Sequence, residues 1–391
     1  MPEVKPDIET FAKIKVIGVG GAGGSAINRM IQSKIKGVEF IAVNTDLQAL
    51  HYSLAPAKLH IGKGITRGLG AGMDPDLGRR AAEESQNEIR DMLKGADMVF
   101  LTCGLGGGTG SGATPLIAEI AKESGALTVA VVTKPFAFEG GQRREIAERA
   151  HAELSDKVDT VITIPNDRVL QIIDKKTPLL EAFDVVDDVL RQGVQGISEI
   201  ITVPGNINAD FADVRTIMSH GGSAFMGIGK GSGENRAADA AKAAIASPLL
   251  EVSIDGARGI LFTIAGGSNL GMHEVNEAAK IITGSADPAA KIKWSVVFDE
   301  TMKDEIKITV IAAGFAESRE ATFLGTKVGV LPSKTSYSPS RIFGLGKETT
   351  KEDKLPKSFE VRAVKREETR DKATEEEDLD IPPILRKKLG K

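Results

Sequence analysis

The stretch that decides the fold is DMVFLTCGLGGGTGSGATPLIAEIAKESG, residues 97–125. It opens with a largely apolar run of strand length, Asp97–Cys103, and continues with six glycines inside Gly104–Gly112. Apolar side chains then follow at helical spacing up to Gly125, a residue type that commonly ends a helix. The stretch therefore predicts a strand, a glycine-rich turn and a helix in direct succession.

The same succession occurs closer to the amino terminus. The run IKVIGV (Ile14–Val19) leads into GVGGAGG (Gly18–Gly24), which holds five glycines, and SAINRMIQ follows with a helical period. Two further apolar runs, FIAVNTD (Phe40–Asp46) and LTVAVVTKP (Leu127–Pro135), are typical of strands. Strands that alternate with helices form parallel sheets, and strands this rich in Val, Ile and Ala are buried on both faces. We expect a parallel α/β domain.

A long helix and a second set of strands follow this domain. From Pro178 to about Val203 the apolar residues step by three and four, which predicts one helix that ends at Pro204–Gly205. Between residues 216 and 315, SAFMGIG, ARGILFTIAGG, KWSVVFD and EIKITVIAAGF are typical of strands, and Ala237–Ser247 is typical of a helix. We interpret this block as a second α/β domain.

The carboxyl-terminal part of the chain has a different composition. Lys347–Lys391 contains 25 charged residues among 45, so it has too little apolar surface to offset the entropy of ordering and should be disordered. The last stretch, EEEDLDIPPILRKKLGK (Glu375–Lys391), sets aliphatic residues between acidic and basic flanks. This pattern indicates a recognition peptide on a tether; the alternative is a solvated tail with a few stray aliphatic residues.

Composition and charge exclude several classes of protein. Lys and Arg number 50 against 54 Asp and Glu, so the net charge of −4 provides no basic field for nucleic acid. The single cysteine, Cys103, excludes a disulfide scaffold and fits a reducing cytoplasm, and the five histidines show no metal-ligand spacing. The charged start Met1–Phe11 is unlike a secretory signal, and no apolar run approaches the roughly 20 residues that span a bilayer. We expect a cytoplasmic protein without a metal site of its own.

Glycine-rich turns between a strand and a helix present backbone N–H groups to phosphate oxygens. Gly18–Gly23 matches GxGxxG, and Asp46 could then bind the ribose of a nicotinamide dinucleotide. That interpretation leaves the second loop, with Thr109 and Ser111, unexplained, whereas two converging phosphate loops suit a polyphosphate. No GxxxxGK(S/T) string occurs, so a Walker A site is excluded. A purely structural use of the glycines, in tight turns, is the remaining alternative.

Three polar residues follow the break at the end of the long helix. Asn208 is a plausible N-cap, which would put Asp210 and Asp213 one turn apart on one helix face, as paired carboxylates. Acidic residues in a first turn also stabilise a helix through its dipole, by about 0.3–1 kcal/mol. Spacing alone favours this second interpretation.

The string GGGTGSG, placed after a strand and opening a helix, resembles the signature of the tubulin and FtsZ superfamily of GTPases. Further segments resemble FtsZ sequences in the same order: GVGGAGGSAINRM, AVNTDLQAL, GLGAGMDPDLGRRAA, VVTKPFAFEG, IPNDRVL, DDVLRQGVQGISEII, NADFADVRTIM and SHGGSAFMGIG. The match runs from about Ile14 to Phe315, and DLDIPPILRK resembles the peptide that ends FtsZ chains. The chain is identified as a bacterial-type member of the FtsZ family, the GTP-dependent, tubulin-like proteins that polymerise into the division ring.

The resemblance implies a tubulin-like α/β fold with five parts. These are a GTP-binding domain over 1–177, a central helix over 178–203, a smaller α/β domain with the catalytic loop over 204–318, a disordered linker over 319–376 and an adaptor-binding peptide over 377–391. It implies head-to-tail protofilaments, a place at the mid-cell ring beneath the membrane, only indirect contact with that membrane and no nucleic-acid partner. Division adaptors and regulators would bind the peptide through Leu379, Asp380, Ile381, Pro382, Ile384, Leu385 and Arg386.

The resemblance also implies which residues contact GTP and GDP. The first loop would contact the phosphates, the second would hold the β- and γ-phosphates, and further loops would sense the phosphate end and bind ribose and guanine. The full set is Gly20, Gly21, Ala22, Gly23, Gly24, Ser25, Asn44, Ala71, Gly72, Gly104, Gly106, Gly107, Gly108, Thr109, Gly110, Thr133, Glu139, Arg143, Asn166, Phe183 and Asp187. A carboxylate at Asp187 suits guanine, because it can accept from both N1–H and the exocyclic amine; the alternative is a solvent-facing helical Asp.

In the family, the loop with Asn208, Asp210 and Asp213 enters the GTP site of the next subunit and positions water for attack on the γ-phosphate. Two carboxylates that face a triphosphate repel it, so Mg²⁺ carried by the nucleotide is required. Two competing functions stay open. One is a nicotinamide-dependent oxidoreductase, supported by GxGxxG alone, and the other is a tubulin-like protein that controls cell shape, against which the IPPILRK tail argues by analogy.

Overall fold

The computed structural model describes residues 12–171, 173–174, 176–202, 210–247, 254–299, 302 and 304–315, all within one compact unit, residues 1–321. Asn208, the Pro204–Gly205 break and the carboxyl-terminal linker and peptide lie outside the described residues. In the described part of the chain, no helix combines the length and apolar character that a membrane span needs.

The amino-terminal half contains the parallel sheet that its alternating pattern predicts. Its strands are β1 (Ile14–Val19), β2 (Val38–Asn44), β3 (Ala57–His60), β4 (Met98–Gly104), β5 (Leu127–Lys134) and β6 (Thr160–Pro165). They lie in the order β3-β2-β1-β4-β5-β6, and every neighbouring pair is parallel. The order reverses between β1 and β4. In open α/β sheets, ligands bind beyond the carboxyl ends of the strands at such a reversal.

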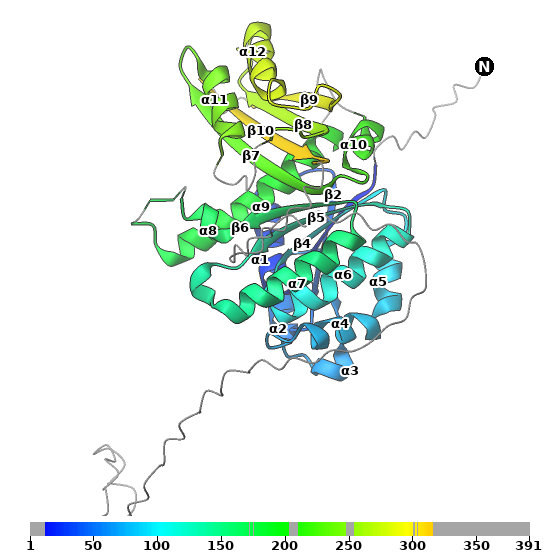
Figure 1. Ribbon diagram of the computed structural model, residues 1–391. Helices are drawn as coiled ribbons and strands as arrows, with labels where there is room; N and C mark the ends of the chain where they lie inside the picture. Colours follow the sequence, from blue (N-terminus) through cyan, green and yellow to red (C-terminus); the bar gives the residue numbers. More distant parts are fainter. Residues whose placement is uncertain are drawn as a thin grey trace, which may run out of the picture. The chain divides into compact units, whose positions relative to one another are not determined.

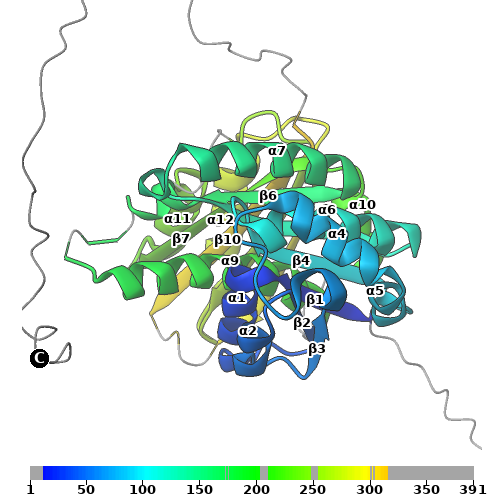
Figure 2. The ribbon, with the colours of Figure 1, turned by 90° about the horizontal axis from the view of Figure 1, so that it is seen from below.

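Helices cover both faces of this sheet. They are α1 (Gly20–Gln32), α2 (Leu47–Tyr52), α3 (Lys63–Thr66), α4 (Pro75–Glu84), α5 (Gln86–Leu93), α6 (Gly108–Glu123), the 3₁₀ turn η1 (Ala137–Glu139), α7 (Gly141–Lys157) and α8 (Asn166–Val169). Figure 2 shows α4 to α7 over one face and α1 over the other. Alternate strand residues supply the two cores: Met98 and Phe100 pack on the α1 side, Val99 and Leu101 on the α6 side. The period of two explains why the strands are apolar throughout.

The carboxyl-terminal half extends the same sheet. Its elements are the central helix α9 (Leu179–Thr202), α10 (Phe211–Met218), β7 (Gly222–Ser232), α11 (Arg236–Ile245), β8 (Gly259–Gly266), α12 (Met272–Thr283), β9 (Lys291–Phe298) and β10 (Glu305–Ala313). β10 runs antiparallel between β7 and β8, and β9 pairs parallel to β8. Thr160–Ile162 of β6 pair with Gly222–Ala224 of β7. The two blocks of strands therefore form one ten-stranded sheet (Figure 1).

Candidate functional site

The two glycine-rich loops meet at the reversal of strand order. A Cβ atom on Gly20 would lie 3.1 Å from the backbone nitrogen of Gly110, and one on Gly104 would lie 2.8 Å from the Cβ of Ala22. Gly20 also has a φ of +74°, which non-glycine residues rarely adopt. The loop after β1 and the loop after β4 therefore touch, as the prediction of two converging loops requires, and side chains at these positions would force them apart.

A third glycine-rich stretch, Gly62–Gly78, leads into α4, and its end lies behind the second loop. A Cβ on Gly78 of α4 would lie 2.4 Å from the carbonyl oxygen of Gly108, and one on Gly112 would lie 1.9 Å from that of Pro75. Ala71, which precedes α4, is also in contact distance of Gly108. These glycines let α4 press directly against the start of α6. Part of the glycine content thus serves helix packing, and the packing fixes where the second loop lies.

The other predicted nucleotide contacts line the same edge of the sheet. Asn44 ends β2, Thr133 lies near the end of β5, and Asn166 begins α8 directly after β6. The side chain of Glu139 in η1 pairs with Arg143 in α7. A Cβ on Gly106 would lie 2.9 Å from the carbonyl oxygen of Arg143, which brings that pair to the second loop.

Phe183 and Asp187 come from the start of the central helix. The Phe183 ring meets that of Phe136 edge to face, with centroids 5.5 Å apart. Burial and, to a smaller extent, the charge of Asp184 raise the pKa of Asp187 to about 7, against an opposing effect of Arg29. Asp187 is therefore a half-buried carboxyl and not the fully solvated one of the alternative interpretation.

Asn166 has an unused hydrogen-bonding atom. Its side chain is only 7% exposed, and its buried Oδ1 has no partner among the described residues. Leaving a buried acceptor unpaired costs about 1–3 kcal/mol, so this atom needs a partner, which can be a water molecule, an ion or a ligand. The sequence pattern could not have shown this, because burial at that position depends on α8 and the packing around it.

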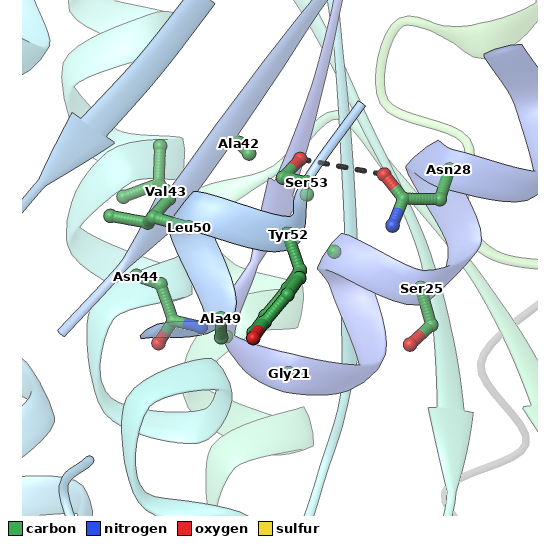
Figure 3. A pocket seen from close by; sticks show the side chains of 13 residues that line it. Gly21, Ser25, Asn28, Ala42, Val43, Asn44, Ala49, Leu50, Tyr52 and Ser53 are labelled. Atoms are coloured by element: carbon green, nitrogen blue, oxygen red, sulfur yellow. Dashed lines mark hydrogen bonds between the residues drawn. The ribbon is translucent and has the colours of Figure 1, made fainter. Parts of the chain in front are cut away.

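A pocket of about 290 Å³ opens beside the first loop, between α1 and α2 (Figure 3). Gly20, Gly21 and Asn44 form its phosphate-loop side. Across its far side the Ser53 hydroxyl donates to Oδ1 of Asn28, at 3.4 Å. The Tyr52 side chain is 78% exposed at this pocket.

Two residues directly after β2, Thr45 and Asp46, make contacts that the sequence pattern did not predict. Oδ1 of Asp46 accepts from the backbone N–H groups of Gln48 and Ala49, at 2.8 and 3.2 Å, so this carboxylate caps α2. The nicotinamide interpretation needed this carboxylate to bind a ribose, but in the structure it is used to cap a helix. The neighbouring Thr45 was not singled out, yet its hydroxyl lies 2.8 Å from that of Thr109.

The paired carboxylates lie at the opposite edge of the sheet. Met218 of α10 accepts from the hydroxyl of Thr160, the first residue of β6, and Arg215 of α10 donates to the carbonyl of Gly125, just before β5. α10 therefore lies at the amino ends of the strands, whereas the glycine loops lie at their carboxyl ends. Figure 1 shows α10 at one end of this sheet and α2 and α3 at the other.

The predicted cap of α10 is wrong. Asp210, not Asn208, is the N-cap residue, because its Oδ1 accepts from the N–H of Ala212 at 3.5 Å and its backbone is extended. Asp213 follows in the first turn, and its carboxylate pairs with Lys293 of β9 at 2.9 Å. Within the described residues, no three His, Cys, Asp or Glu side chains gather as they would to hold a metal ion.

A reversal of strand order flanked by two touching glycine-rich loops defines a nucleotide-binding α/β protein. Comparison with known proteins identifies which one. Residues 13–174 match the GTPase domain of the tubulin/FtsZ family, and residues 222–316 match the FtsZ family C-terminal domain.

Solved structures of FtsZ are similar over most of the chain. An empty FtsZ dimer from M. jannaschii is 45% identical, with a TM-score of 0.76 over 78% of this chain and 89% of that one. A mutant of M. jannaschii FtsZ is 44% identical, also with a TM-score of 0.76, over 78% of this chain and 92% of that one. CetZ2 from Haloferax volcanii, in a GTPγS-bound protofilament, shares the fold at 23% identity, with a TM-score of 0.67 over 78% of this chain and 94% of that one.

The chain belongs to the tubulin/FtsZ family and is an FtsZ-type GTPase. It is therefore a member of a class of polymerising cytoskeletal proteins that bind GTP and GDP. The oxidoreductase interpretation is excluded.

Proposed function

We propose that the chain forms the cell-division ring, assembling head to tail and hydrolysing GTP at the junction between consecutive subunits. One observation carries this proposal. The glycine loops lie at the carboxyl ends of the strands, and the Asp210–Asp213 turn lies at the amino ends of strands in the same sheet. Strands of six to eight residues, at about 3.3 Å each, separate these two ends by about 20–26 Å. The carboxylates are thus too far to act on a nucleotide held by their own chain.

A head-to-tail contact removes this separation. If the carboxyl edge of one subunit meets the amino edge of the next, Asp210 and Asp213 of one copy face the phosphate loops of the other. A contact of this heterologous kind, with no closing rotation, gives an open filament. The similarity to an FtsZ that was solved as a dimer supports self-association.

In this proposal the loops recognise the nucleotide from the phosphates to the base. Backbone N–H groups of Gly20–Ser25 and Gly108–Gly110 would hold the phosphates at the amino ends of α1 and α6. Ionised Asp187 would accept from guanine N1–H and the exocyclic amine, and the unused Oδ1 of Asn166 would accept a further hydrogen bond from the nucleoside. Adenine has no such pair of donors, so GTP is preferred over ATP.

Hydrolysis then needs a positioned water molecule and little covalent chemistry from the protein. The water oxygen attacks the γ-phosphorus, the bond to the β-phosphate oxygen breaks, and GDP and inorganic phosphate leave. Asp210 and Asp213 of the neighbour, with Asn208, would accept hydrogen bonds from that water and orient it. Mg²⁺, held by the phosphate oxygens, would offset their repulsion of these carboxylates.

The carboxyl-terminal tail would connect filaments to the membrane. Residues 319–376 would act as a flexible linker, and the peptide over 377–391 would bind adaptor and regulator proteins, so membrane contact is indirect. This assigns the chain to the cytoplasm, at the mid-cell ring.

The test mixes two inactive variants. Thr109→Arg obstructs the phosphate loop but keeps the carboxylates, whereas Asp213→Ala keeps the loop but lacks one carboxylate. Each alone should hydrolyse almost no GTP. Mixed in equal amounts, they should recover activity, because about a quarter of randomly formed head-to-tail junctions join an intact loop to intact carboxylates.

Asp239→Ala is the matched control, since Asp239, like Asp213, is an acid in the first turn of a helix, here the first turn of α11, and it is exposed. It should hydrolyse GTP normally. Electron microscopy with GTP, with GDP and without nucleotide should show GTP-dependent filaments for Asp213→Ala. If the two variants co-assemble and activity does not return, hydrolysis does not use a shared site.

A further inference from the structure

Thr45 lies at the junction of three loops beside the phosphate site. It follows β2 directly and is completely buried. Its hydroxyl lies 2.8 Å from the hydroxyl of Thr109 in the second glycine loop. Thr109 is also buried, with 7% of its surface exposed. A buried hydrogen bond between two side chains, 64 residues apart in the sequence, ties the segment after β2 to the loop after β4.

The backbone of Thr45 reaches a third segment. Its carbonyl oxygen accepts from Nε2 of His60 at 3.0 Å and from the hydroxyl of Thr66 at 3.5 Å. Thr66 ends α3, in the stretch that leads to Ala71 and Gly72. Ala71 in turn contacts Gly108, so the second glycine loop is held both through Thr45 and through Ala71.

The hydroxyl pair has a direction that depends on its ligand. A threonine hydroxyl has one hydrogen to donate and two lone pairs to accept with. If Thr45 donates to Thr109, the Thr109 hydrogen is left to donate elsewhere, and Thr109 lies in the loop at the start of α6, where phosphate is expected. If Thr109 donates to Thr45 instead, its oxygen faces the phosphate with lone pairs, which is unfavourable. A bound phosphate therefore selects the first arrangement.

We propose that Thr45 is a positioning residue of the phosphate site. Its buried hydroxyl donates to Thr109, so that the Thr109 hydroxyl donates to the terminal phosphates of the nucleotide. The proposal rests on the proposed function in one respect, namely that Gly104–Gly112 binds those phosphates. Thr45 itself touches no phosphate and takes no part in the bond breaking.

Thr45→Val is the direct test, because valine keeps the shape of threonine and loses only the hydroxyl. Titration with a fluorescent GTP analogue should show about tenfold weaker binding, as expected for loss of one hydrogen bond to a buried group. Thr45→Ser, which keeps the hydroxyl, should bind within about twofold of the unmutated protein. Thr128→Val is the matched control: Thr128 is equally buried, bonds to a backbone carbonyl and lies at the other end of the sheet.

A double-mutant cycle separates positioning from general packing. In a Thr109→Val background, Thr45→Val should weaken binding by less than about twofold, because the residue it acts through is already gone. Unchanged binding in Thr45→Val, failure of Thr45→Ser to restore it, or an equal loss in the Thr109→Val background would each overturn the proposal.

Two further measurements keep the test decisive. If Thr45→Val does not fold, Thr109→Val against Thr109→Ser tests the same bond from its other end, and equal GTP binding by these two overturns the proposal. Thr109→Arg distinguishes this inference from the proposed function. If Thr109→Arg still binds GTP normally, the loop is not the phosphate site and the proposed function fails first. If it does not bind while Thr45→Val binds normally, only the role of Thr45 is wrong.

Discussion

We expect GTP binding to depend on pH, because Asp187, the proposed guanine contact, has a raised pKa. Burial and the charge of Asp184 bring the pKa of this carboxyl to about 7, whereas Arg29, paired with Asp184 at 3.8 Å, lowers it. Guanine offers donors to this side chain, so only the ionised form is competent to bind both of them. With a pKa of about 7, roughly one tenth of the molecules are ionised at pH 6 and roughly nine tenths at pH 8. GTP affinity should therefore rise about tenfold across this range.

The sign for stability is the reverse. A carboxyl whose pKa is higher in the folded than in the unfolded protein holds its proton longer when folded, so it favours folding below its unfolded pKa. That stabilisation decreases as the pH rises toward the folded pKa of about 7, and above this pH it is lost. The nucleotide-free protein should thus lose stability mainly between pH 6 and about 7, with little further loss above that, while its GTP affinity increases. Few titrating groups would give these two opposite trends together.

The assay is GTP titration by calorimetry at constant ionic strength from pH 6 to 8. The nucleotide phosphates also titrate there, so Asp187→Asn, which has no proton to lose, provides the baseline. Asp184→Asn removes the neighbouring charge and should move the profile to lower pH. The reasoning is refuted if the unmutated protein and Asp187→Asn show the same pH dependence.

Two other predictions concern packing and the tail. Gly112→Ala should destabilise the nucleotide-free protein by about 2–3 kcal/mol in urea unfolding, because its Cβ would lie 1.9 Å from the carbonyl oxygen of Pro75. Gly107→Ala, in the same loop, meets nothing within 4 Å and should change stability by less than about 0.5 kcal/mol, so equal effects would contradict the packing argument. Truncation after Glu376 should leave sedimentable polymer and GTP hydrolysis intact while abolishing adaptor binding; loss of polymer would show that the tail is not a separable peptide.

Local patterns in the sequence were sufficient for most of the elements and for the family. The strand, glycine turn and helix predicted over residues 97–125 appear as β4 and α6. Apolar periodicity and glycine positions predict such elements because they depend on interactions between residues that are close in the sequence. The central helix, expected over 178–203, spans Leu179–Thr202. Two glycine loops after parallel strands also had to approach one another, since the carboxyl ends of such strands share one edge.

Capping and burial were harder to predict. Asn208 and Asp210 are both good N-cap residues by type, and only the backbone geometry selects Asp210. Asp187 could have been a solvated helical acid, and its raised pKa depends on packing beside α1 and Asp184. The hydrogen bond between Thr45 and Thr109 has no local pattern at all, since it joins residues distant in the chain.

The sequence by itself determined the two glycine-rich loops, the central helix and the membership of the tubulin/FtsZ family, because each depends on short-range pattern or on motif order. Only the tertiary structure decided that β6 pairs with β7, so that both blocks of strands form one sheet. That pairing fixes α10 at the amino ends of the strands, with Asp210 and Asp213 remote from the glycine loops of the same chain. Spacing along a chain does not encode which edge of a sheet a residue will reach; strand order and direction do.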